Sequence, residues 1–170
     1  MGVYQVGQYI IYGNDGVCKV EAIGSLDMRG VREGVNYYTL KPLYQAGKIY
    51  VPVDTEKFSR PVMSREEALV LIEEIPNIPA EIYENNNPRL LGEHYQNYLK
   101  THDCKDLLRV IRSIYVKGEK AAARGRRLGQ VDERSLKQAM EILHGELAVA
   151  LGIEKDQVED YIVKTLENDC

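Results

Sequence analysis

The residues whose types and spacing could do chemistry lie in a basic stretch of the second half of the chain. Five positive charges face one negative charge, Glu119, between Lys117 and Arg127. Phosphate groups favour such a cluster, because each neutralised phosphate releases condensed counterions. A charge run can equally be a solvated loop. The stretch therefore predicts either contacts with nucleic-acid phosphates or an exposed connection.

No other residues have a spacing typical of a catalytic or metal site. His94, His102 and His144 are isolated, and the sequence contains no H-E-x-x-H, G-x-S-x-G or P-loop motif. The adjacent acidic pairs Glu66-Glu67 and Glu73-Glu74 are expected to point to different sides of a helix. We therefore expect no catalytic residues, no bound metal and no cofactor, so the protein should not be an enzyme.

Cysteine usage indicates a reducing compartment, and the hydropathy of the sequence indicates no membrane helix. Cys18, Cys104 and Cys170 are widely spaced and form no C-x-x-C motif, which argues against disulfides and a zinc site. No apolar run approaches the roughly 20 residues of a membrane helix. The first residues lack the basic and apolar regions of a signal peptide. We expect a cytoplasmic monomer that does not bind membranes.

Charge is unevenly distributed along the 170 residues, whose total is −4. Residues 1–60 carry a net charge of +1 and residues 61–102 carry −4. Residues 103–137 carry +5 and residues 138–170 carry −6. A basic segment between acidic flanks fits one local contact with a polyanion. Its affinity should be modest, because the acidic remainder of the molecule repels a duplex.

The elements that must position these residues begin with a predicted β hairpin. Tyr9 to Tyr12 is a run of β-branched and aromatic residues. Gly13 to Gly16 supplies residues that tolerate positive φ, so the chain can reverse there. Apolar and charged residues then alternate with period two, which is typical of a second strand. The apolar face of that strand is predicted to contain Cys18, Val20 and Ala22.

Two further strands are predicted, at Val35 to Leu40 and at Ile49 to Val53. Pro52 has no N–H to donate, so its strand should lie at an edge of the sheet or have an unpaired side. An open edge next to apolar residues can bind a strand of another protein. Pro52 can equally protect the edge against aggregation. Residues 1–60 are thus expected to form a small β barrel-like domain.

From residue 61 onward the hydrophobic period becomes helical. Ser64 and Glu67 form a capping box at the start of a first helix. Pro88 suits the first turn of a second helix, and Asp103 is expected to cap a third. The basic stretch is expected to be the end of that helix and a connection. Together these signals predict an α-helical domain over residues 61–170 and an α+β fold overall.

Two more helices complete this predicted domain. Asp132 is expected to cap a long helix, which Gly152 should end. The apolar face of that helix contains Leu136, Ala139, Met140, Leu143 and Leu147. A last helix is defined by Val158, Tyr161, Ile162 and Leu166.

Two segments, one in each half, resemble the CarD family of bacterial transcription regulators. The second segment runs from Arg126 to Ala148 and is similar to the family's Ala-x-x-Leu-Leu/Val-x-Glu-Leu-Ala block. The first is also similar to the RNA-polymerase-interacting domain of the transcription-repair coupling factor, although Gly13 and Asp15 stand where the family usually has Pro and His. The residues that carry the first resemblance are Val6, Gly7, Tyr12, Gly16, Val17, Val20 and Ile23.

The resemblance implies a Tudor-like β barrel that binds the β subunit of RNA polymerase, followed by a helical domain that contacts upstream promoter DNA. Stabilisation of the open promoter complex would be its effect. The implied polymerase-binding residues are Leu26, Met28, Lys48, Ile49, Tyr50 and Val51. The candidate DNA-binding residues, which would contact mainly phosphates, weakly and without sequence preference, are Leu91, Arg112, Lys117, Lys120, Arg124, Arg126 and Arg127.

Leu91 stands where the family has a tryptophan wedge, because Tyr95 matches a tyrosine four residues after that tryptophan. Leucine can act as an apolar wedge at an unstacked base step, or it can be a helix-packing residue. Gly92, Glu93 and Gln96 stand where the family has basic residues, which argues against DNA contact on this face. The alternative function is a protein-interaction adaptor without DNA contact.

Overall fold

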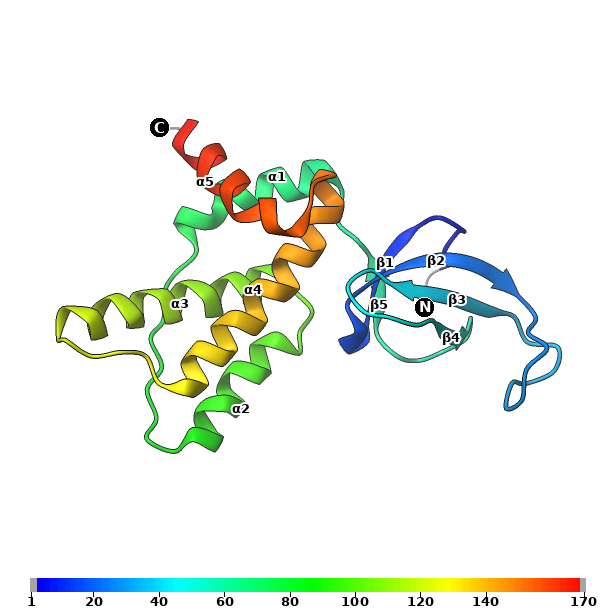
Figure 1. Cartoon of the computed structure of the whole chain (residues 1–170), viewed down its shortest axis with the longest axis horizontal. Coiled ribbons are helices and arrows are strands. Elements are labelled where there is room, and N and C mark those ends of the chain that lie inside the picture. Colours follow the sequence, from blue (N-terminus) through cyan, green and yellow to red (C-terminus); the bar gives the residue numbers. More distant parts are fainter. Residues whose placement is uncertain (1–2, 169–170) are drawn as a thin grey trace.

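Five strands precede a group of helices, so the chain has an α+β fold (Figure 1). The structure is a computed structural model and describes residues 3–168. We call the strands and their loops the sheet half and the remainder the helical half. The strands are β1 (Tyr9–Tyr12), β2 (Val17–Gly24), β3 (Tyr37–Pro42), β4 (Ile49–Pro52) and β5 (Ser59–Pro61).

The strands form one antiparallel sheet in the order β4-β3-β2-β1-β5. The predicted hairpin is confirmed as β1 and β2, and the strand that contains Pro52 lies at an edge, as expected. The predicted Tudor-like barrel is not closed. Closure would require β4 to pair with β5, and within residues 3–168 each of them pairs on one side only. Pro52 also removes a donor that closure could have used.

The sheet half buries one face of the sheet over its own core. Ile10, Val20 and Leu40 are almost fully buried there. The predicted alternation in β2 holds at Cys18 and Val20, but Ala22 is exposed. The reason is a register shift between Val20 and Ala22, which turns the rest of the strand by one residue. The strand β5 was not predicted, because it is three residues long and has no alternation.

The first three helices begin where the capping residues indicate. They are α1 (Arg65–Glu74), α2 (Pro88–Leu99), α3 (Cys104–Ala123), α4 (Gln130–Leu151) and α5 (Val158–Asn168), with short 3-10 turns at Gly13–Asp15, Ile75–Asn77 and Lys155–Gln157. The capping box of Ser64 and Glu67 is confirmed, as are Pro88 in the first turn of α2 and the cap at Asp103. Gly152 ends α4 with a φ of 70°, the left-handed conformation that favours glycine.

The basic stretch is the end of α3 and a connection, as predicted, because α3 continues to Ala123 and Lys117 and Lys120 are helical. One detail of the α3–α4 connection differs from the prediction. Asp132 is not a cap: α4 begins one turn earlier, after Gly129, and Asp132 is buried in its first turn. A capping pattern in the sequence cannot tell an acidic N-cap from an acidic residue that packs inward.

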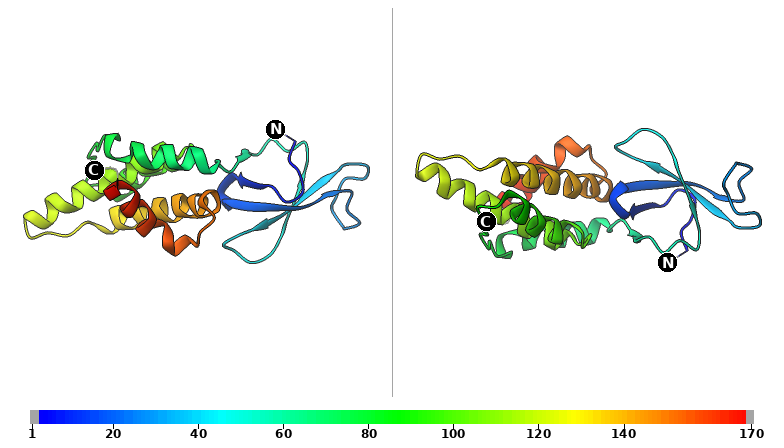
Figure 2. Two further views of the ribbon diagram at one scale, coloured as in Figure 1. Left: turned by 90° about the horizontal axis from the view of Figure 1, so that it is seen from above. Right: turned by 90° about the horizontal axis from the view of Figure 1, so that it is seen from below.

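The two halves lie end to end along the long axis of the molecule (Figures 1 and 2). The helical half has its own core, around Ile72, Ile114, Leu143 and Leu147. No described helix combines the length and apolar character that a membrane span needs. Cys18 and Cys104 are free and buried, whereas Cys170 lies outside the described residues.

Candidate functional site

The free edge of β4 presents an exposed tyrosine and unpaired backbone groups. The N–H of Val53 donates to the carbonyl of Asn36 over 3.0 Å, which fixes the alternation of hydrogen bonds between β3 and β4. The backbone groups of Tyr50 therefore point away from β3, towards solvent. The Tyr50 side chain is 41% exposed. At the other outward position the Pro52 carbonyl accepts from the N–H of Thr55 over 3.0 Å, so the N–H and C=O of Tyr50 are the groups at which strand addition by a second protein could begin.

The other residues predicted beside this edge differ in what they can offer. Met28 is 50% exposed in the β2–β3 loop, and Leu26 is half-buried. Lys48 forms an ion pair with Glu21 over 3.1 Å. The remaining two, Ile49 and Val51, turn their side chains to the core of the sheet half, and Val51 is only 3% exposed. Tyr50 and Met28 are thus the exposed side chains outside an ion pair, Lys48 is exposed but paired, and Ile49 and Val51 can contribute only backbone.

Four basic residues gather where α3 ends and the chain turns towards α4. We call Lys120, Arg124, Arg126 and Arg127 the basic turn; all four are exposed. They line a groove of about 540 Å³ together with Glu84 and the end of α3. Within residues 3–168 none of the four forms a salt bridge. The basic turn is therefore free to contact an anion, and it lies at the opposite end of the molecule from the β2–β3 loop (Figure 1).

Lys117, predicted to be part of the same basic surface, lines the same groove, but buried groups of the helical half hold its ammonium. Its Nζ lies 2.9 Å from Asp132 Oδ2 and donates to the carbonyl of Tyr83 over 3.1 Å. The Tyr95 hydroxyl donates to Asp132 Oδ1 over 2.5 Å. Burial and then the Asp132 carboxylate raise the pKa of Tyr95 well above its usual value. Lys117 therefore neutralises a buried carboxylate and is not available to a phosphate, which corrects its assignment to the DNA-binding set.

Leu91 is also a core residue, which corrects its assignment as a possible DNA wedge. Its side chain is 7% exposed and packs in the core of the helical half. The neighbouring Leu90 is 39% exposed. Arg112 lies on α3, is half-buried, and its Nε is buried without a hydrogen-bond partner in the described residues. Neither Leu91 nor Arg112 is among the residues that line the basic groove.

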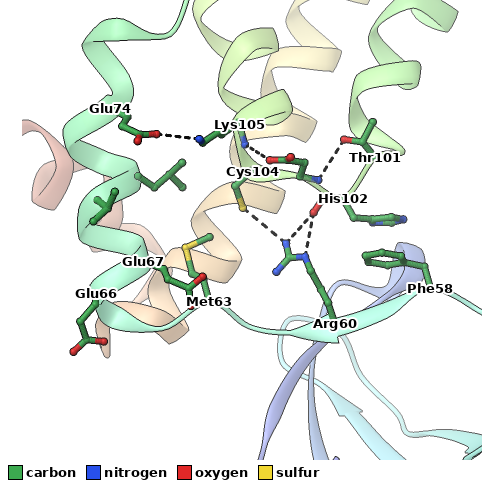
Figure 3. A pocket seen from close by; sticks show the side chains of 13 residues that line it. Phe58, Arg60, Met63, Glu66, Glu67, Glu74, Thr101, His102, Cys104 and Lys105 are labelled. Atoms are coloured by element: carbon green, nitrogen blue, oxygen red, sulfur yellow. Dashed lines mark hydrogen bonds and ion pairs between the residues drawn. The ribbon is translucent and has the colours of Figure 1, made fainter. Parts of the chain in front are cut away.

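An ion pair with a buried carboxylate joins the two halves. Arg60 on β5 donates to both carboxylate oxygens of Glu146 on α4, each over 2.7 Å. Arg60 also donates to the carbonyl of His102 in the α2–α3 loop, over 2.9 Å from Nη2. Figure 3 shows the guanidinium reaching from the strand to His102 and the sulfur of Cys104. The side chain of Glu146 is 3% exposed and that of Arg60 is 28% exposed, so the carboxylate is shielded from water and the guanidinium is partly open to it.

Ring contacts support the same junction. Phe58 stacks on His102 with the ring centroids 4.4 Å apart. The φ of His102 is 57°, a left-handed conformation that is uncommon for a residue other than glycine. Tyr44, from the β3–β4 loop, donates to the carbonyl of Gly145 over 2.8 Å, and Lys155 lies 4.5 Å from its ring centroid. A groove of about 670 Å³ opens beside these contacts, along α1 (Figure 3).

The junction shifts the pKa of several groups. Burial lowers the pKa of the Arg60 guanidinium, but the hydrogen bonds and the charge of Glu146 outweigh it, so the net shift is upward. Burial, and then Glu146, raise the pKa of the Cys104 thiol far above its usual value. Burial and the nearby Arg60 lower the pKa of His102. Arg60 is thus charged and Cys104 is a thiol, not a thiolate, at neutral pH.

Sequence reasoning missed this junction, although one signal was present. Glu146 stands three residues after Leu143 and one before Leu147, on the apolar side of α4. A carboxylate in that position needs a partner, because an unpaired buried charge is costly. The partner, Arg60, lies 86 residues away in sequence, and no local pattern could identify it.

Comparison with known families gives two matches. A family model described as the CarD-like/TRCF RID domain matches residues 4–63, and one described as the CarD C-terminal domain matches residues 80–163. No curated protein matches the chain significantly. Within the described residues, no group of three or more His, Cys, Asp or Glu side chains could hold a metal ion.

Proposed function

Because the chain belongs to the CarD family, whose domains are those of RNA-polymerase-interacting transcription factors, we propose that it binds the β subunit of RNA polymerase and contacts promoter DNA. The proposal treats residues 1–60 as the polymerase-binding domain and residues 61–170 as the DNA-facing domain. The protein would act as a cytoplasmic monomer, without catalysis, a metal or a cofactor.

The observation that carries the polymerase contact is the open β4 edge with its exposed Tyr50. Strand addition pairs the free N–H and C=O groups of an edge with those of a partner strand, and neighbouring side chains supply specificity. Tyr50 would provide apolar surface and a hydroxyl next to that pairing, with Lys48 beside it. Met28 and Leu26, in the β2–β3 loop, would extend the contact.

The proposed DNA contact rests on the basic turn. Its four exposed cations suit phosphates, which carry no sequence information themselves. Binding to free DNA should therefore be weak, independent of sequence and steeply dependent on salt. The contact becomes effective when polymerase holds the protein beside the promoter, because tethering raises the local concentration of DNA.

The mechanism would be a shift in population between closed and open promoter complexes. Contacts that form only beside melted DNA favour the open complex in proportion to their free energy. With Leu91 buried, the chain would supply these contacts from the basic turn and not from an apolar wedge at that position.

The second candidate function is an adaptor that binds polymerase without touching DNA. Two residues expected to contact DNA favour it, because Leu91 is buried in the helical core and the Lys117 ammonium is paired with Asp132. The two candidates share the β4 edge and differ only at the basic turn. Variants of the basic turn, described below, distinguish them.

The polymerase contact can be tested by retention on immobilised RNA polymerase without DNA. Tyr50→Glu should abolish retention, because a charge would be buried in an apolar contact beside the edge. The matched control is Tyr115→Glu, the same substitution at a 62% exposed tyrosine of α3, which should be retained like the parent. Equal retention of a folded Tyr50→Glu protein would remove the edge-docking proposal.

A further inference from the structure

We propose that Glu146 is a positioning residue: with Arg60 and Tyr44 it locks the sheet half and the helical half in one fixed orientation. We call these three residues and Gly145 the clamp. The clamp would make the molecule a rigid spacer between the β4 edge and the basic turn. Without it, the two family domains could move independently.

The carboxylate of Glu146 has every acceptor site filled. Its Oε1 accepts from Arg60 Nη2 over 2.7 Å and from the Cys104 thiol over 3.2 Å. Its Oε2 accepts from Arg60 Nη1 over 2.7 Å and from the N–H of Met63 over 3.0 Å. A carboxylate offers about four lone-pair sites, so no acceptor is left over. One buried side chain thus binds the last strand, the linker and the start of α3 at once.

Each backbone N–H group of the linker donates a hydrogen bond, so the linker is not a free hinge. It consists of the three residues between β5 and α1. Val62 donates its N–H to the carbonyl of Tyr9 in the sheet half, over 3.1 Å. The next residue, Met63, donates to Glu146, and Ser64 donates to Glu67 over 3.2 Å. Rotation about this segment would break hydrogen bonds to both halves, so the linker holds the same orientation of the two halves as the clamp does.

Gly145 supplies the second contact point, one residue from Glu146. A Cβ at this position would lie 2.9 Å from Cε2 of the Tyr44 ring. That distance is too short for two carbon atoms, so a side chain there would displace the ring and its 2.8 Å hydrogen bond. Glycine in the middle of a 22-residue helix lowers helix propensity, and the close approach of Tyr44 explains its presence.

The consequence for transcription rests on the proposed function. The β4 edge and the basic turn lie in opposite halves of the molecule (Figure 1), and the clamp lies where the two halves meet. A rigid body directs the basic turn to one site on the DNA once polymerase holds the other end, whereas a flexible joint would lose entropy on every contact. Clamp variants should therefore shorten the open-complex lifetime while leaving polymerase retention and free-DNA binding unchanged.

The clamp itself can be tested on the free full-length protein, without polymerase. Residual dipolar couplings and ¹⁵N relaxation report whether the two halves tumble as one body. One alignment tensor should fit both halves of the parent. Gly145→Ala should require two tensors and show shorter tumbling times for each half. Gly92→Ala is the matched control, because its added Cβ meets Val131 at an ordinary 3.8 Å and should leave the single tensor intact.

Glu146→Gln provides a second variant, which removes the charge but keeps the size. One alignment tensor should no longer fit both halves of this variant. The loss of the buried charged partner of Arg60 should also lower its stability. Gly145→Ala carries the test if Glu146→Gln does not fold, because alanine favours the helix. A single tensor in folded Gly145→Ala would overturn the clamp, whatever the polymerase assays show. Failure of polymerase retention in the parent would instead overturn the proposed function and leave the clamp standing.

Discussion

Lys117 and Lys120 lie almost one turn apart on α3, and only their surroundings separate their roles. The Lys117 ammonium is held by Asp132 and by the carbonyl of Tyr83, whereas Lys120 is exposed. Lys117→Met should therefore lower the free energy of unfolding by about 3–5 kcal/mol, because it leaves the Asp132 carboxylate buried without a cation. Lys120→Met should change it by about 0.5 kcal/mol or less. Urea unfolding of the two variants measures this difference, and equal stabilities would contradict the buried network.

Residue roles could be predicted where the chemistry is local, as in the capping box at Ser64. They could not be predicted where the partner is distant in sequence. A basic stretch predicts cations at a surface, but burial of Lys117 depends on α4 bringing Asp132 to it. Glu146 likewise owes its role to Arg60, 86 residues away. Leu91 occupies the position of a wedge in the family pattern, and only the packing of α2 shows that it faces inward.

The basic turn is a property of an element, the last turn of α3 and the connection after it. Basic side chains are stabilised at a helix C-terminus by the helix dipole, so their position alone has a structural explanation. Salt dependence separates the two roles. A quadruple Gln variant of the basic turn should reduce the slope of log K against log salt for DNA binding by about one unit per lost phosphate contact.

The control for this measurement carries the same loss of charge elsewhere. Gln at four other exposed positions, Arg29, Lys41, Lys100 and Lys164, changes the net charge equally without touching the basic turn. This control should keep most of the parent slope, because only long-range attraction is lost. Equal slopes for the two variants would mean that the basic turn contacts no phosphates. The protein would then act as the adaptor.

Element types followed from the sequence more completely than the arrangement of the sheet. The change of period at residue 61 predicts the helices, and Pro52 predicts an edge strand correctly. The prediction of a closed barrel was wrong. Closure depends on pairing between β4 and β5, and these strands lie at opposite edges of the sheet. Three-residue β5 has no periodicity to detect; it exists because β1 offers it a free edge.

The whole molecule combines two small cores joined by a polar junction. Neither core extends across the boundary, so the junction depends on Arg60, Glu146 and the rings of Tyr44, Phe58 and His102. A junction of this kind is specific in direction, because hydrogen bonds and stacked rings require fixed geometry, whereas apolar contact alone tolerates sliding. The two family matches could therefore predict two domains but not their mutual orientation.

The three histidines give the molecule a shared response to acid. Burial lowers the pKa of His94, of His102 (where Arg60 adds to the effect) and of His144, in each case below the ordinary histidine value of about 6.5. Below pH 6.5 the unfolded chain therefore binds more protons at these sites than the folded protein does. The free energy of unfolding must then fall as the pH decreases from 6.5, since protons favour the state that binds more of them.

Urea unfolding at a series of pH values measures this response. The decrease should be visible between pH 6.5 and about 5, above the range in which most carboxylates titrate. Replacing the three histidines with glutamine should flatten the profile in this window, because glutamine cannot bind the proton. His102→Gln alone should flatten it partly and leave the His102 carbonyl bonded to Arg60, since that bond uses only backbone. A stability that rises as the pH falls from 6.5 to 5, or a triple variant with the parent's profile, would show that the histidines are not held neutral by the fold.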